Sequence, residues 1–156
     1  MSRLHPKARV PMRIKHLARQ EPTASPSGTV NMTKPKPQSD RLVYEQLARN
    51  FEKSEGQLSE LRWRWLMAAH IVGQLYIGLH WRNHVAMLRF ALRNQDYPEV
   101  AGQLFRLMLV PLGHLLGKLP AGNIGRATVN AFHPMPLDPS LQRLISDTRK
   151  QILHGG

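Results

Sequence analysis

The chain has 156 residues and a formal net charge of +12, from 22 Lys and Arg against 10 Asp and Glu. The absence of cysteine excludes disulfides, thiolate zinc sites and thiol catalysis. The basic excess would attract nucleic acid or an anionic membrane surface at low salt, or it simply belongs to a basic protein without such a partner.

Residues 1–40 predict a disordered, basic, Pro-rich tail. They hold half of the chain's 12 prolines and few apolar side chains, so they cannot bury enough surface to offset the entropy of ordering. Met32 precedes a short polar leader, and residues 1–31 are interpreted as an upstream extension of the folded chain. No secretory signal and no run long enough to span a bilayer is found, so we expect a cytoplasmic protein.

Residues 41–152 predict a helical domain. A first helix is expected at about 41–55, with Val43, Leu47 and Phe51 on one face and Ser39 or Asp40 as its cap. A second helix is expected at about 58–75. It is apolar on two opposite sides, so we expect it to lie sandwiched between neighbours at the centre of the fold.

A third helix, at about 79–93, is the clearest amphipath. Its arginines 82, 89 and 93 share one face, which we expect to be exposed, whereas His80 and His84 lie on the opposite face together with apolar residues. The pair of histidines is therefore predicted to be buried.

A fourth helix is expected to begin at Asp96, with Glu99 completing a capping box. Four apolar residues are predicted to form its buried face, and three polar ones a separate stripe. The predicted buried residues are Val100, Leu104, Leu107 and Met108, and the polar stripe is Glu99, Gln103 and Arg106. Residues 111–138 predict a Gly/Pro-rich loop with apolar anchors, and a last helix starts at Asp138-Pro139.

The predicted fold class is all-α, with two tetratricopeptide-like helical hairpins followed by the Gly/Pro-rich loop and a C-terminal helix that covers the repeats. Stacked hairpins present a concave face that binds partner segments. The leading functional hypothesis is therefore a helical-repeat interaction module with a protein partner.

A second hypothesis is a metal-binding protein. His70, His80 and His84 lie within an apolar run, and an i, i+4 pair such as His80 and His84 places two rings on one helical face. A tight turn around Gly78 would bring His70 to them, and Met67 would add a thioether. Zn, Cu and Ni are the candidate ions. Binding requires neutral imidazoles, so we expect it to fail below about pH 6.

The alternative for these histidines is a structural role, with ring nitrogens bonded to polar core groups or backbone carbonyls. Gln74 and Gln103 each follow a Gly and are predicted to be contact residues. Asn123 and Arg126 belong to the "PAGNIGR" loop, which is either an anion-binding nest or a tight turn that needs positive φ at its glycines.

An enzyme is not favoured, because no Ser or Thr stands in a nucleophile motif and the acids are scattered. Nucleic-acid binding is a third hypothesis, weakened because the arginine face of the third helix carries no interleaved aromatic residues.

The strings "AHIVGQ", "EVAGQLFRL", "LPAGNIGRATV" and "PMPLDPSL", together with His80 and His84, resemble the bacterial domain-of-unknown-function family 3703 over about residues 45–145. The resemblance implies a small helical cytoplasmic protein of unestablished activity, associated with metal-resistance gene neighbourhoods. Family members usually carry Glu-Arg-Ala-His where this chain has residues 67–70, so Met67 replaces a carboxylate suited to a metal site.

Overall fold

A computed structural model describes residues 37–154. The predictions for residues 1–36, including a start of the folded chain at Met32, concern residues outside this range. The described residues form five helices and no strand, which confirms the all-α class. The helices are α1 (Pro37–Lys53), α2 (Ser59–Gly73), α3 (Ile77–Arg93), α4 (Tyr97–Leu115) and α5 (Pro139–His154).

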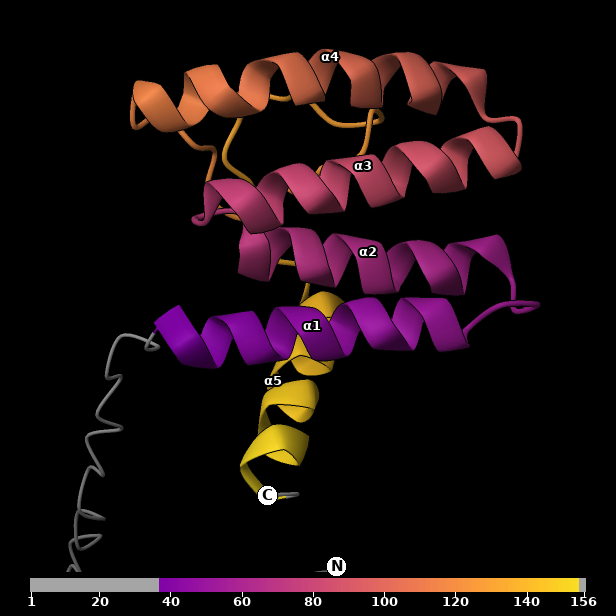
Figure 1. Ribbon diagram of the computed structural model, residues 1–156, viewed down its shortest axis with the longest axis vertical. Helices are drawn as coiled ribbons and strands as arrows, with labels where there is room; N and C mark the ends of the chain where they lie inside the picture. Colours follow the sequence, from indigo (N-terminus) through magenta and orange to yellow (C-terminus); the bar gives the residue numbers. More distant parts are fainter. Residues whose placement is uncertain (1–36, 155–156) are drawn as a thin grey trace, which may run out of the picture. The chain divides into compact units, whose positions relative to one another are not determined.

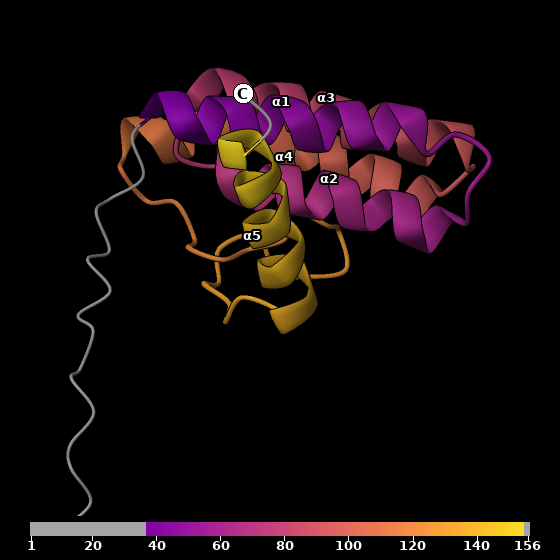
Figure 2. The same cartoon turned by 90° about the horizontal axis from the view of Figure 1, so that it is seen from below.

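Helices α1 to α4 lie side by side in chain order, joined by short turns (Figure 1). The pairs α1·α2 and α3·α4 are packed, α2 also packs on α3, and α5 crosses α1 and α2 (Figure 2). Within residues 37–154 no helix has the length and apolar character needed to cross a membrane.

Two hydrophobic clusters meet at α2, as its two apolar sides predict. One cluster contains Val43 and Leu47 of α1 with Ala68 of α2, and α5 packs on it. The other joins Trp63 of α2 to Phe90 of α3. Because α2 contributes to both, it is the centre of the bundle, and His70 lies buried near its C-terminal end.

The start of α1 differs from the expectation. The helix begins at Pro37, so Asp40 lies inside it and neither Ser39 nor Asp40 occupies a cap position. Asp40 instead accepts hydrogen bonds from the Tyr76 hydroxyl at 3.1 Å and from Arg149 at 2.9 Å. These tertiary partners, distant in sequence, give the carboxylate a structural role that local capping rules do not contain.

Helix α4 is oriented opposite to its prediction. Its polar stripe is buried, with Gln103 fully so, whereas Leu104 and Met108 are exposed, Met108 to 77%. Val100 and Leu107 are half-buried. The stripe faces α3 and the following loop, which provide partners for each polar group, so its burial carries little penalty. The N-cap is confirmed, since Asp96 accepts from the Glu99 N–H, but the Glu99 side chain turns inward.

The loop begins later than expected, because α4 continues through Pro111 to Leu115. Within the loop, Gly122 and Gly125 have φ of +73° and +79°, so the predicted tight turn with positive φ is present. The Asp138 carboxylate caps α5 by accepting from the N–H groups of Ser140 and Leu141. Apolar residues of α5, including Leu141, pack against the first cluster as predicted.

Candidate metal centre

The three predicted histidines meet in the interior. The Nε2 atom of His70 lies 3.1 Å from Nε2 of His80 and 3.2 Å from Nε2 of His84, and the last two atoms are 3.1 Å apart. All three residues are buried. The reversal between α2 and α3 falls at residues 74–76, whereas Gly78 lies inside α3, so the turn that joins them is earlier than predicted.

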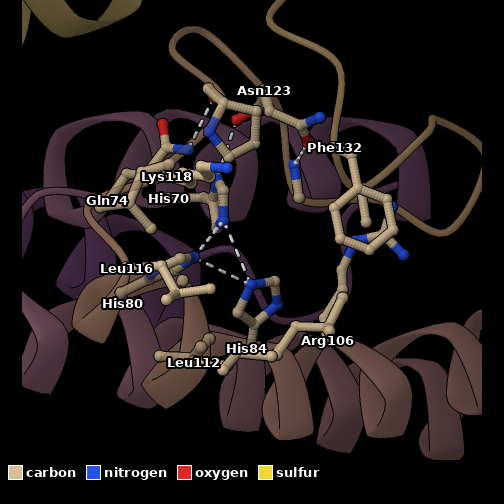
Figure 3. Close-up of a pocket in the computed structure, with 17 residues that line it drawn as sticks. His70, Gln74, His80, His84, Arg106, Leu112, Leu116, Lys118, Asn123 and Phe132 are labelled. Atoms are coloured by element: carbon tan, nitrogen blue, oxygen red, sulfur yellow. Dashed lines mark hydrogen bonds between the residues drawn. The ribbon is translucent and has the colours of Figure 1, made fainter.

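The outer nitrogen of His70 determines which ring nitrogen carries the proton. Its Nδ1 lies 2.9 Å from the backbone carbonyl oxygen of Asn123. A carbonyl oxygen only accepts, so Nδ1 must donate and therefore carries the hydrogen. In the neutral ring Nε2 then carries a free lone pair, which points toward the other two histidines (Figure 3).

His84 is fixed in the same way through a side chain. Its Nδ1 lies 2.7 Å from Oε1 of Gln103. The Gln103 amide nitrogen donates to the Glu99 carboxylate at 2.6 Å and to the Gly125 carbonyl at 2.9 Å. Both are acceptors, which orients the amide so that its oxygen faces the ring. His84 thus also presents an Nε2 lone pair to the centre.

The position of Gln103 depends in turn on Glu99, which is almost completely buried. Its carboxylate accepts from the Arg126 Nε–H at 2.9 Å and from the Ala127 N–H at 3.0 Å. Arg126 also lies over the Trp63 ring, with 3.8 Å between the guanidinium carbon and the ring centroid. A chain of polar groups therefore runs from Arg126 through Glu99 and Gln103 to His84.

His80 has a third kind of partner. Its Nδ1 lies 3.1 Å from Nε2 of His114, on α4. Either ring can donate in this contact. When His80 donates from Nδ1, all three Nε2 atoms of the triad are unprotonated and face one another. The tautomer of His80 thus decides whether the centre holds one hydrogen or none.

The surroundings keep the triad neutral. Burial, together with the neighbouring imidazoles, lowers the pKa of His80 to about 3. Burial lowers the pKa of His84 to about 4 and holds that of His70 well below its usual value. An additional proton on the triad is therefore disfavoured near neutral pH, and the hydrogen that can enter the centre is the one that neutral His80 carries in its Nε2–H tautomer.

The geometry suits a small cation. Three nitrogens separated by 3.1–3.2 Å lie about 1.8 Å from the centre of their triangle, which is slightly less than the usual Zn–N distance of roughly 2.0–2.1 Å. The second-layer bonds from Nδ1 to carbonyl and amide oxygens are those that orient ligating histidines. The buried triad could hold a metal ion.

The three histidines also line one cavity of about 150 Å³, between α3, α4 and the loop (Figure 3). Most of its wall is apolar, from leucines of α4 and the loop and from Phe132. Arg106 and Lys118 line it as well, and no Asp or Glu is among the described residues of its wall. The triad is therefore accessible from a largely apolar chamber with a positive electrostatic character.

The structure places the other predicted residues around this centre. The Gln74 amide donates to the Pro120 carbonyl at 2.7 Å, and the Asn123 amide donates to the carbonyls of Asn130 and His133. Both residues thus hold the loop against the triad. Met67 packs against the two hydrophobic clusters and is not part of the cavity wall.

Gly125 is required by the close approach of the loop. A Cβ atom there would lie 2.7–2.9 Å from atoms of the His70 ring, in addition to the positive φ. Gly102 has a similar role on α4, where an added Cβ would overlap the side chain of Ala127. These glycines let the loop backbone lie directly on the centre.

Sequence reasoning missed three residues of this site: Glu99, Arg106 and His114. The capping box and the polar stripe do not predict the roles of Glu99 and Arg106 in this site, and no predicted site includes His114. Glu99, Gln103, Arg106 and His114 recur at spacings of three or four, or their sums, along α4. The sequence signal that indicates these residues is the polar stripe itself, because it lies on the helix that follows the two histidines predicted to be buried.

A buried group of three imidazoles, held by two packed helix pairs and a loop, defines an all-helical protein with a candidate nitrogen-donor metal site. The chain belongs to the family described as protein of unknown function (DUF3703), whose model matches residues 38–145 and includes all three histidines. No curated protein and no solved structure matches the chain significantly.

Proposed function

We propose that this protein binds a divalent transition-metal ion through the Nε2 atoms of His70, His80 and His84. One observation carries the proposal: two of the three rings have their outer N–H committed to an acceptor, so their inner lone pairs converge at 3.2 Å. These lone pairs repel one another, and a bound cation removes the repulsion. An additional proton is disfavoured, because burial lowers the pKa of each ring, and the Nε2–H tautomer of His80 is the alternative in which the centre holds a hydrogen instead of an ion.

The donor set indicates the class of ion. Three imidazoles without a thiolate or carboxylate suit Zn²⁺, Cu²⁺, Ni²⁺ and Co²⁺, and are unsuited to Mg²⁺ or Ca²⁺. Met67 packs in the hydrophobic clusters, and no thioether that would favour Cu⁺ lies among the described residues of the cavity wall. Three protein ligands next to a cavity resemble the arrangement of zinc sites that keep one position for another molecule.

The test is the melting temperature of the metal-free chain, prepared without a histidine tag, with and without each ion. An ion that binds only the folded chain raises the melting temperature by mass action. We expect a rise with Zn²⁺ that is lost in His80→Gln and His84→Gln. The exposed His154 provides a matched control, since His154→Gln should keep the full rise. Absence of a rise with all four ions would contradict the proposal.

The exposed face of α4 favours a second candidate function, a tetratricopeptide-like interaction module whose partner is a second copy of the chain. All nine exposed residues of α4 are uncharged: Tyr97, Pro98, Ala101, Leu104, Phe105, Met108, Pro111, Leu112 and Leu115. Contiguous apolar patches of this kind mark interaction sites. Two basic chains could pair there about a twofold axis without bringing like charges together on that face.

Sedimentation of the full chain over a range of concentrations tests this second function. We expect a dimer that Met108→Gln combined with Leu112→Gln converts to monomer, whereas Leu153→Gln, on an equally exposed leucine of α5, leaves it intact. A wild-type chain that is monomeric at every concentration would rule out self-association through α4.

A further inference from the structure

The proposed metal binding, on which this subsection rests, leaves a fourth position on the ion. We propose that this position takes an exogenous anion with a short apolar body, such as a small carboxylate, bound in the cavity that the three histidines line. The three side chains supply only three ligands. The described cavity wall adds no thiol, carboxylate or fourth imidazole, and its Gln74 and Asn123 amides are bonded to the loop, so the proposed fourth ligand comes from outside the chain.

The charge of the cavity selects an anionic head group. Arg106 is buried in the wall, and its guanidinium donates to the backbone carbonyls of Arg126 and Val129. Carbonyls are neutral, and no ion pair of Arg106 is found within residues 37–154, so its positive charge is not cancelled by a salt bridge. The nearby carboxylate of Glu99 is paired with Arg126 instead. A divalent ion would add to this field.

The rest of the cavity selects an apolar body. Leu112 and Leu116 of the α4 end, Leu119 of the loop and Phe132 form its wall beyond the histidines (Figure 3). A cavity of about 150 Å³ can enclose a molecule about as large as benzene. A four-carbon carboxylate has six heavy atoms, the same number, so its head can reach the ion while its chain contacts the leucines.

The experiment uses the full chain loaded with Co²⁺, whose visible absorption reports changes in its ligands. Butyrate, acetate and the neutral isostere butyramide are titrated separately. We expect butyrate and acetate to change the spectrum, with butyrate binding about tenfold more tightly because two further methylene groups are buried. Butyramide should leave the spectrum unchanged, since it lacks the charge.

Two variants separate the head from the body of the ligand. Leu116→Gln should remove the advantage of butyrate over acetate while leaving acetate binding intact. Arg106→Gln should weaken both anions, and Arg143→Gln, at an exposed position on α5, should weaken neither. A Co²⁺ spectrum that no anion changes, or equal affinities for butyrate and butyramide, would overturn the inference while leaving metal binding standing. If Co²⁺ instead binds the wild-type chain and the His80→Gln, His84→Gln double variant alike, or binds neither, both proposals fail.

Discussion

The Nδ1 atom of His84 lies 2.7 Å from Oε1 of Gln103, and the same amide is held from its other end by Glu99. This relationship links an imidazole on α3 to a buried carboxylate on α4. It explains why the polar stripe of α4 faces the interior, because each of its groups completes a bond that the triad or the loop requires. The orientation of His84 is thus set outside the triad.

Replacing Gln103 with Leu should therefore weaken the site without touching a proposed ligand. The His84 Nδ1–H and the Glu99 carboxylate each lose a buried partner, so we expect a loss of about 1–3 kcal/mol in the free energy of unfolding. Metal affinity should fall by about 10- to 100-fold, as for other second-layer residues. Chemical denaturation and metal titration measure the two effects. An unchanged metal affinity would show that Gln103 does not orient His84.

His114 should affect metal binding more than stability. It lies half-buried at the end of α4, and its Nε2 atom contacts Nδ1 of His80. In His114→Ala, His80 loses its outer acceptor, and we expect metal affinity to fall by up to about 100-fold. The free energy of unfolding should change by less than about 1 kcal/mol, as is usual near the surface. Equal metal affinity in the variant and the wild type would show that His114 does not orient His80 for metal binding.

Gly125→Ala tests how closely the loop lies on the triad. Ala adds a Cβ within 3 Å of the His70 ring, at φ of +79°, so both steric contact and backbone strain oppose it. Gly56→Ala is the matched control, with φ of +84° and nothing within 4 Å of the added atom. We expect Gly125→Ala to lower the unfolding free energy by about 1–3 kcal/mol more than the control does. Equal losses in denaturant titrations would show that the loop does not press on His70.

The pH dependence of the metal-free protein follows from the lowered pKa values. An unfolded histidine has a pKa near 6.5, whereas the folded chain holds His80 at about 3 and His84 at about 4. The unfolded state therefore binds more protons below pH 6.5, so stability falls as the pH drops from about 6.5 toward 4. Replacing the three histidines with Gln should flatten this part of the curve, which denaturation across that pH range measures. If the free energy of unfolding of the variant falls as steeply with pH as that of the wild type, the three histidines are not the origin of the pH dependence.

The same shifts revise the expected pH limit of metal binding. Free imidazole would lose its metal below about pH 6, but in the folded chain protons compete for His80 and His84 only near their lowered pKa values. We therefore expect Zn²⁺ affinity to stay nearly constant between pH 7.5 and about pH 6. Isothermal titration calorimetry at several pH values in this range measures it. A tenfold fall per pH unit across this range would show that the rings titrate as exposed ones.

The sequence predicted the parts of this structure that depend on one helix or one turn. Periodicity placed His80 and His84 on the buried face of α3, and an antiparallel connection brought His70 to them. It failed for α4, where burial of Glu99 and Gln103 depends on partners from a loop and another helix. Hydrophobicity alone predicts that Met108 is buried. In the structure, however, the face of α4 that packs against α3 and the loop consists mainly of polar residues.

Whether the Nε2 atoms of the triad ligate one ion can be measured by X-ray absorption at the zinc edge of the chain loaded with one equivalent of Zn²⁺. We expect three imidazole nitrogens at about 2.0–2.1 Å and one further light ligand. The imidazole signal should disappear in the triple His70→Gln, His80→Gln, His84→Gln variant and persist in His154→Gln. A wild-type spectrum with fewer than three imidazoles, or one that the triple variant reproduces, would contradict ligation by the triad.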